Sequence, residues 1–204
     1  MNRALLREIL TLSLEHLWLV SLAVLAATAI AAPLAVFLTR HAEPRRWTLA
    51  AVNIIQTIPS LALFGFLLPL PLIGGVGKQT AIIALILYAL LSVLRNSVVG
   101  IMGIDPHVRQ AAVAMGMTDN QILWGVELPL ALPTILAGVR IATVTTIGTA
   151  TIAAAIGGGG LGTFVFRGIS MVDTSTILAG AVPAALMAIT ADEVLEWVER
   201  RFSY

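Results

Sequence analysis

Long apolar runs alternate with short polar segments along the chain, and five of the runs are long enough to cross a bilayer. A membrane-spanning helix needs roughly 20 predominantly apolar residues. The pattern therefore predicts an all-α membrane protein with five transmembrane helices, the second interrupted by Pro59. Five passes place the two termini on opposite sides of the membrane. The predicted passes are Leu17–Leu38, Trp47–Ile73, Thr80–Met102, Leu128–Ile156 and Thr176–Val198.

Composition supports a membrane protein and excludes nucleic acid as a partner. The chain is 58% hydrophobic and 11% charged, whereas a soluble domain carries about 25% charged residues. A net charge of +1 provides no basic block to neutralise phosphates. We expect one transmembrane domain over residues 1–204, with a core at 13–199, in contact with membrane lipid. Glu8 interrupts the N-terminal stretch and no cleavage site follows, so we predict no cleaved signal peptide.

Arginine and lysine in short loops predict the orientation, because cytoplasmic loops carry an excess of both. Six such residues fall on one side and four on the other. We therefore predict an external N-terminus, with the C-terminus and the central polar insert in the cytoplasm. The six are Arg40, Arg45, Arg46, Arg109, Arg200 and Arg201, and the four are Arg3, Arg7, Lys78 and Arg167.

The central insert, residues 105–123, has the sequence signals of two short helices. Asp105 can cap a helix that starts with Pro106, and Gly116 interrupts the helical pattern. Thr118 and Gln121 have the spacing of a capping box for a second helix. The first helix places apolar side chains on one face, at Val108, Ala111, Ala112 and Met115.

Two interpretations of this first helix differ in what covers its apolar face. An amphipathic helix that rests on lipid favours basic residues on its polar face and bulky aromatics on the other. Here the apolar face is small and alanine-rich, and Arg109 is the one basic residue on the polar face. Small residues allow another backbone to come close, which favours a protein partner.

The insert resembles the cytoplasmic loop of permease subunits of ATP-binding-cassette importers. That loop reads E-A-A, three residues, glycine, nine residues, then I-x-L-P. Gln110-Ala111-Ala112, Gly116 and Val126-Glu127-Leu128-Pro129 have the same spacing, with Gln110 in place of glutamate and Val126 in place of isoleucine. Much of Gln56–Ile169, including "QTIPSLALFGFLLPLPLIG" and "LRNSVVGI", resembles the permeases for glycine betaine, carnitine, choline and related osmoprotectants.

The resemblance implies a type I importer permease fold in a prokaryotic inner membrane. It implies a second permease subunit, identical or related, two cytoplasmic ATPase subunits and an extracytoplasmic substrate-binding protein. ATP and magnesium would bind to the ATPase, and no cofactor to this chain. The insert would be the coupling helix that docks in a groove of the ATPase, with contact residues Asp105, Pro106, Val108, Arg109, Gln110, Ala111, Ala112, Met115 and Gly116.

Polar residues inside the predicted passes need a partner or a role, because an intramembrane charge costs about 2.5–3.5 kcal/mol on insertion scales. We assign Arg95 and Arg140 to structure or gating. Arg95 can also snorkel to the interface, and Arg140 can cap helix carbonyls or pair with an acid of a partner subunit. Residues around the interruption of the second pass border the translocation route or belong to ordinary helix packing. These candidates are Gln56, Thr57 and Pro59, with Asn96 as a further one.

The segment Gly157–Gly162 matches the G-x-G-x-x-G pattern, but it follows a membrane helix and not a strand, so we reject a dinucleotide site. With "TFVFRGI" it is interpreted as a flexible external turn. It is either a connector or a gate that meets the binding protein through Phe164, Phe166 and Arg167. The histidines show no metal-like spacing, and no acid–base set supports an enzyme.

The leading hypothesis is therefore the permease subunit of an ATP-driven osmoprotectant importer. An importer permease for another small solute, such as an amino acid, is the first alternative. A stand-alone carrier or channel, with the insert as a surface helix, is the second, and a membrane-embedded enzyme is the third. Co-purification of an ATPase separates the importer hypotheses from the other two.

Overall fold

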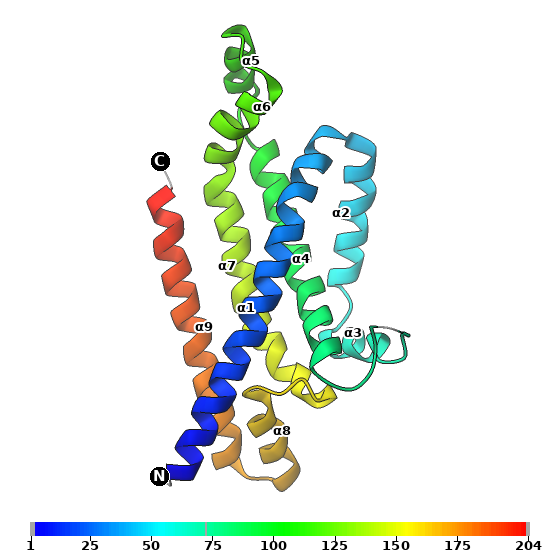
Figure 1. The fold of residues 1–204 in the computed structure, drawn as a ribbon, viewed down its shortest axis with the longest axis vertical. Coiled ribbons are helices and arrows are strands. Elements are labelled where there is room, and N and C mark those ends of the chain that lie inside the picture. The colour runs from blue at the N-terminus through cyan, green and yellow to red at the C-terminus, as the bar shows by residue number, and fades with distance from the viewer. Residues whose placement is uncertain (1–2, 72, 203–204) are drawn as a thin grey trace.

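The computed structural model describes residues 3–71 and 73–202, which leaves Leu72 of the second predicted pass outside. The described residues are almost entirely helical, which confirms the all-α prediction. Four long helices run side by side (Figure 1). They are α1 (Arg3–Arg40), α4 (Lys78–Met102), α7 (Leu128–Ala153) and α9 (Thr174–Phe202).

The second predicted pass is two helices and not one. Helix α2 (Ala42–Gln56) and helix α3 (Ser60–Leu67) meet at a bend of 103°. Pro59 cannot donate a backbone hydrogen bond, so the helix is interrupted there. Length and composition make four helical stretches of the described chain capable of crossing a membrane, or up to five if the bent pair counts as one.

Helix α1 is longer than the apolar run that predicted it. It starts at Arg3 and not at Leu17, because its first turns contain charged residues that the hydropathy pattern excludes. The other long helices begin and end within four residues of their predicted bounds, apart from a final 3₁₀ turn, Ala154–Ile156 (η2), after α7.

Short helices lie at the two ends of the molecule. Helix α5 (Pro106–Ala114) and helix α6 (Asp119–Ile122) project at one end, and the C-terminal end of α9 points toward that end. The N-terminus and helix α8 (Gly162–Met171) lie at the other end (Figure 1). The start of α1 and the end of α9 therefore lie toward opposite ends of the molecule.

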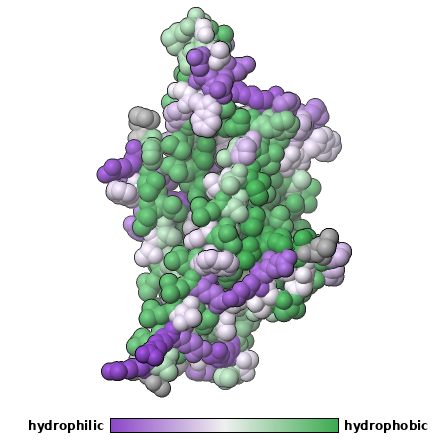
Figure 2. Space-filling view, viewed as in Figure 1, coloured by the Kyte–Doolittle hydropathy of each residue, from purple (hydrophilic) through white to green (hydrophobic). Residues whose placement is uncertain are grey.

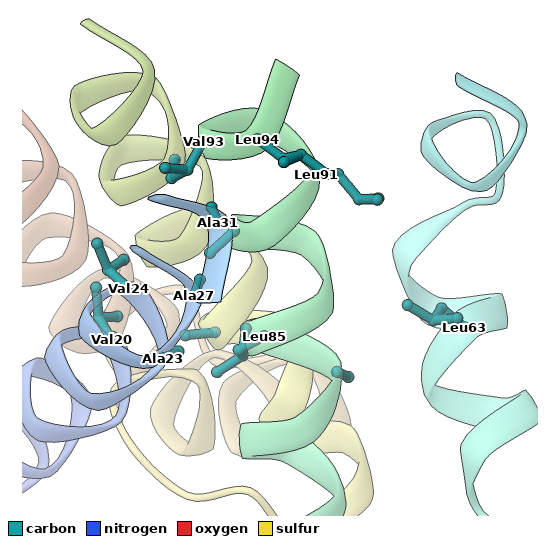
Figure 3. Close-up of a cluster of buried hydrophobic side chains, with 14 of the residues drawn as sticks. Val20, Ala23, Val24, Ala27, Ala31, Leu63, Leu85, Leu91, Val93 and Leu94 are labelled. Carbon is teal, nitrogen blue, oxygen red and sulfur yellow. The ribbon is translucent and has the colours of Figure 1, made fainter. Parts of the chain in front are cut away.

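Small side chains at intervals of four bring the long helices together. Ala23, Ala27, Ala31 and Ala35 on α1 are fully buried, and Figure 3 shows the first three on the part of α1 beside α4. Small residues with this spacing allow helix backbones to approach closely in a membrane. Helix α7 carries a similar buried row, Gly138, Ala142, Thr146 and Ala150.

The outer surface is apolar around the middle and hydrophilic toward the ends. Figure 2 shows hydrophobic residues over most of the central band of one face, with many of the hydrophilic ones near the insert and near the N-terminal end. Trp47, Trp124 and Trp197 are exposed on the insert-side parts of their helices. Tryptophan concentrates at membrane–water interfaces, so these residues mark the level beyond which the insert projects.

Candidate functional site

The first helix of the insert begins and ends where the sequence predicts. The Asp105 carboxylate accepts a hydrogen bond from the backbone N–H of His107 at 2.8 Å, and Pro106 is the first helical residue. Gly116 lies just beyond the C-terminal end of α5 and has a φ of +79°. This conformation costs glycine little free energy and costs other residues more. Both ends of α5 are therefore fixed by local chemistry.

The second helix of the insert continues into the membrane without a loop. The predicted capping box is present: Thr118 N–H donates to Gln121 Oε1 at 2.8 Å, and Gln121 N–H donates to Thr118 Oγ1 at 3.4 Å. A π-helical turn, Leu123–Glu127 (η1), connects α6 to α7. Asp119–Ile156 is thus one helical stretch, and a force on α6 acts directly on α7.

The predicted apolar face of α5 is covered by the chain at one position. Ala112 is 1% exposed, whereas Val108, Ala111 and Met115 are exposed, Met115 at 74%. The four apolar residues lie on α5 and at its C-cap as predicted. Most of them are exposed because α5 projects beyond the long helices. Gln110 is also exposed. These exposed apolar side chains leave the predicted contact face of α5 open to a partner.

Arg109 faces the protein as well as solvent. Its Nε donates to Glu127 Oε1 at 3.1 Å and its Nη2 donates to Asp119 Oδ1 at 3.4 Å. The Glu127 side chain is 4% exposed and also pairs with Arg40 at the end of α1. Sequence reasoning missed Glu127. The signal was available, because an acid inside the apolar "VELPL" needs a cationic partner.

The bend between α2 and α3 leaves three predicted pathway residues, Gln56, Thr57 and Pro59, on the surface. The Thr57 hydroxyl donates to the carbonyl of Ile54 at 2.7 Å. From α4, the Tyr88 hydroxyl donates to the carbonyl of Ile58 at 2.7 Å. The Tyr88 hydroxyl thus satisfies a carbonyl that the interruption of the helix frees, as irregular backbone at membrane depth requires.

Asn96 lies in the contact between α4 and α7. A Cβ added to Gly138 would lie 2.5 Å from the Asn96 Cβ, so the two helices touch at this point. The Asn96 side-chain amide donates to the carbonyl of Ser92, one turn earlier on its own helix, at 2.9 Å. We therefore assign Asn96 to helix packing.

Arg140 finds its partners within this chain. Its guanidinium contacts Asp192 at 2.6 Å, Glu196 at 3.2 Å and Glu199 at 3.4 Å, all on α9. The chain itself therefore supplies acids for Arg140, because α9 packs against α7 with one acid per turn facing the arginine, and the assignment of Arg140 to structure or gating stays a prediction. Arg95 is exposed and forms no ion pair with any residue in 3–71 or 73–202.

The glycine segment after α7 is anchored, and its interpretation as a flexible turn was wrong. Glu15 Oε2 accepts from the N–H of Gly160 at 3.0 Å, and Glu15 pairs with Lys78. His16 is fully buried, and its Nδ1 accepts from the N–H of Leu161 at 3.3 Å. Because Nδ1 accepts, the proton lies on Nε2, which donates to the carbonyl of Ile147 at 3.1 Å.

The aromatic segment after these glycines forms α8, and one of its predicted contact residues belongs to the core. Phe164 is 1% exposed, so its assignment to an external contact was wrong. Gly180 of α9 packs on it, since an added Cβ would lie 2.8 Å from the Phe164 Cβ. Arg167 pairs with Glu8 at 2.9 Å, while Phe166 is exposed.

Known proteins resemble this chain over nearly its whole length. The choline transport system permease protein OpuBB of Bacillus subtilis is 42% identical over 96% of this chain and 89% of its own length. The carnitine transport permease protein OpuCD of Listeria monocytogenes is 44% identical over 91% of this chain and 82% of its own. The osmoprotectant import permease protein OsmW of Salmonella typhimurium is 44% identical over 94% and 88%, respectively.

The fold also matches solved transporters. A chain of the MetNI methionine ABC transporter, in an inward-facing conformation, superposes with a TM-score of 0.90 at 22% identity over 100% of both chains. A chain of an amino acid ABC transporter has a TM-score of 0.80 at 19% identity over 96% of this chain and 94% of its own. These likenesses establish a type I importer permease fold. Residues 25–204 match the family described as binding-protein-dependent transport system inner membrane component, and the chain belongs to that family.

Proposed function

We propose that this chain is the permease subunit of an ATP-driven importer for quaternary-amine osmoprotectants such as glycine betaine, carnitine and choline. The observation that carries the proposal is the open apolar face of α5, which lies next to α6, the helix that continues into α7. Relatives at 42–44% identity are named for these solutes. The methionine transporter chain is only 22% identical, which favours osmoprotectants over an amino acid.

The proposed assembly contains two permease subunits, two cytoplasmic ATPase subunits and an extracytoplasmic binding protein that delivers the solute. ATP and magnesium would bind to the ATPase, and this chain would catalyse no reaction. The insert would lie in the cytoplasm with the C-terminus, and the N-terminus outside. The excess of arginine at the insert end supports this orientation.

In the proposed mechanism, the ATPase binds α5, and closure of the two ATPase subunits displaces α5 together with α6. Because α6 is continuous with α7, the displacement tilts α7 and changes which side of the membrane the route faces. The ATPase must bind one facing more tightly than the other, since a partner with equal affinity for both shifts nothing. The bend at Gln56, Thr57 and Pro59 would border the route, and Phe166 and Arg167 would lie near the binding protein.

The charges inside the bundle are compatible with a quaternary ammonium. Arg140 is surrounded by Asp192, Glu196 and Glu199, so it presents no uncompensated positive charge to a cationic solute. Arg140 is therefore not a charge that would repel the proposed cargo.

The test is co-purification and transport in proteoliposomes. The unaltered chain should retain an ATPase and take up a quaternary amine only with ATP. Ala111→Glu places a charge on the open face of α5 and should abolish uptake while membrane insertion persists. Ala111→Ser is the matched control and should transport normally. Normal uptake by Ala111→Glu, or uptake without an ATPase, would favour a stand-alone carrier instead.

A further inference from the structure

Glu127 is a buried carboxylate shared by two arginines from different parts of the chain. Arg40 Nη1 donates to its Oε1 at 3.1 Å and Arg40 Nη2 donates to its Oε2. Arg109 Nε donates to Oε1 at 3.1 Å. A carboxylate removed from water is retained in the charged form when cationic hydrogen-bond donors surround it in this way.

These three residues join three structural segments. Arg40 is in the last turn of α1, Arg109 is in the middle of α5, and Glu127 ends η1 immediately before α7. Helix α5 packs mainly on α6 and η1, and makes little contact with the long helices. The chain itself connects α6 to α7, but α1 is tied to the insert through the Glu127 carboxylate.

A cavity of about 390 Å³ lies beside the three charges. Its walls come from the ends of α1 and α4 and from the start of the insert, including Thr39, Met102 and Pro106. The guanidinium groups therefore have room to move with their helices while they stay bound to the carboxylate. This arrangement is typical of a contact between helices that change position relative to each other. A tightly packed contact would hold them in one geometry.

We propose that Glu127 is a positioning residue that makes α1 move with the coupling helix. When the ATPase displaces α5, Arg109 pulls on the Glu127 carboxylate and the carboxylate pulls on Arg40, so α1 and α7 shift together. Without the carboxylate, α7 still follows the insert through the backbone, but α1 lags behind it. The inference rests on the proposed function and adds to it the residue that makes α1 and α7 move together.

The test compares two acids that pair with the same arginine. In reconstituted importer, Glu127→Gln keeps the side-chain shape and removes the charge. The ATPase should still co-purify and hydrolyse ATP, because the open face of α5 is unchanged, but solute imported per ATP should fall about tenfold, a typical allosteric coupling factor. Asp119→Asn removes the exposed partner of Arg109 and should leave the ratio unchanged.

A double variant separates a shared joint from two independent contacts. Arg40→Gln alone should lower the import ratio as Glu127→Gln does, and the two together should lower it no further, because both break one link. The inference would be overturned if the double variant lowered the import ratio by the product of the two single effects. An unchanged ratio in Glu127→Gln would also overturn it. If Glu127→Gln does not reach the membrane, Arg40→Lys removes the two-pronged contact but keeps the charge. A normal ratio in that variant would also overturn it.

The two proposals fail in different ways. If the unaltered chain retains no ATPase, the proposed function is wrong. If it retains the ATPase and imports solute, but Glu127→Gln imports with an unaltered ratio, only the role of Glu127 is wrong.

Discussion

Arg140 on α7 and Asp192 on α9 form a two-pronged ion pair within one chain. Arg140 Nε lies 2.6 Å from Asp192 Oδ1, and Arg140 Nη2 lies 3.2 Å from Asp192 Oδ2. Helix α9 is the least buried of the long helices. This pair is therefore a main polar contact between α9 and the bundle, in addition to side-chain packing.

Loss of Arg140 should destabilise the protein. Arg140→Gln removes the cation that Asp192, Glu196 and Glu199 of α9 contact, and we expect a lower melting temperature. Thermal unfolding in detergent measures the loss. Arg140→Gln combined with Asp192→Asn should recover part of it. Arg200→Gln is the control: its side chain is 77% exposed, so its effect should stay below about 0.5 kcal/mol, and an equal effect of both would contradict the prediction.

The glycine segment offers a steric prediction. Gly160 has φ of +71°, and an added Cβ would lie 2.8 Å from His16 Nδ1. Gly160→Ala should lower the free energy of unfolding by about 1–3 kcal/mol through backbone strain, with further loss from the displaced histidine. Gly65→Ala in α3 meets no atom within 4 Å and should be neutral or slightly stabilising. Equal melting temperatures for the two variants would contradict the conclusion that the glycine segment is anchored against His16.

Asp173 predicts a pH dependence at the start of α9. Its carboxylate accepts hydrogen bonds from the Thr176 hydroxyl and from the backbone N–H of Ser175, and these bonds lower the pKa of Asp173 below its ordinary 3.8. A lowered folded-state pKa gives stability that is present above the unfolded-state pKa and is lost as pH falls through the folded-state pKa. The melting-temperature difference from Asp173→Ala should thus be constant near neutral pH and shrink below about pH 4. A difference that grows in acid would contradict this.

Tyr88 predicts a local effect at the bend. Tyr88→Phe removes the donor to the Ile58 carbonyl, which should cost about 0.5–1.5 kcal/mol. Hydrogen–deuterium exchange should rise in residues 55–63 and stay unchanged in α7. Thr190→Val on α9 is the control, because it removes an exposed hydroxyl that donates to a carbonyl of its own helix. Exchange that rises everywhere would indicate general destabilisation instead.

Local chemistry explains which features the sequence could predict. The cap at Asp105, the Thr118–Gln121 box and the break at Gly116 involve neighbours in the chain, so residue type and spacing are sufficient. The apolar runs predicted the long helices because membrane depth sets their length. The extra turns of α1 were missed because that criterion ends where charged residues begin.

The missed ion pairs depend on how distant helices align. Arg40 and Glu127 are 87 residues apart, and Arg140 and Asp192 are 52 apart; one sequence does not contain the rotation and depth that bring each pair together. The glycine segment shows a different error. Its glycines were interpreted as freedom to move, whereas positive φ angles and the close approach of Glu15 and His16 require them.

Helix α1 contacts the α7 region near both ends of α7. His16 and its neighbour hold Ile147 and the segment just after α7, while Arg40 holds Glu127 just before α7. The two anchor points on α1 are separated by about 36 Å of helix, roughly the thickness of the bilayer core. The two helices are thus connected near both faces of the bilayer, so a displacement of the insert on one face is transmitted along α1 to the glycine segment near the other.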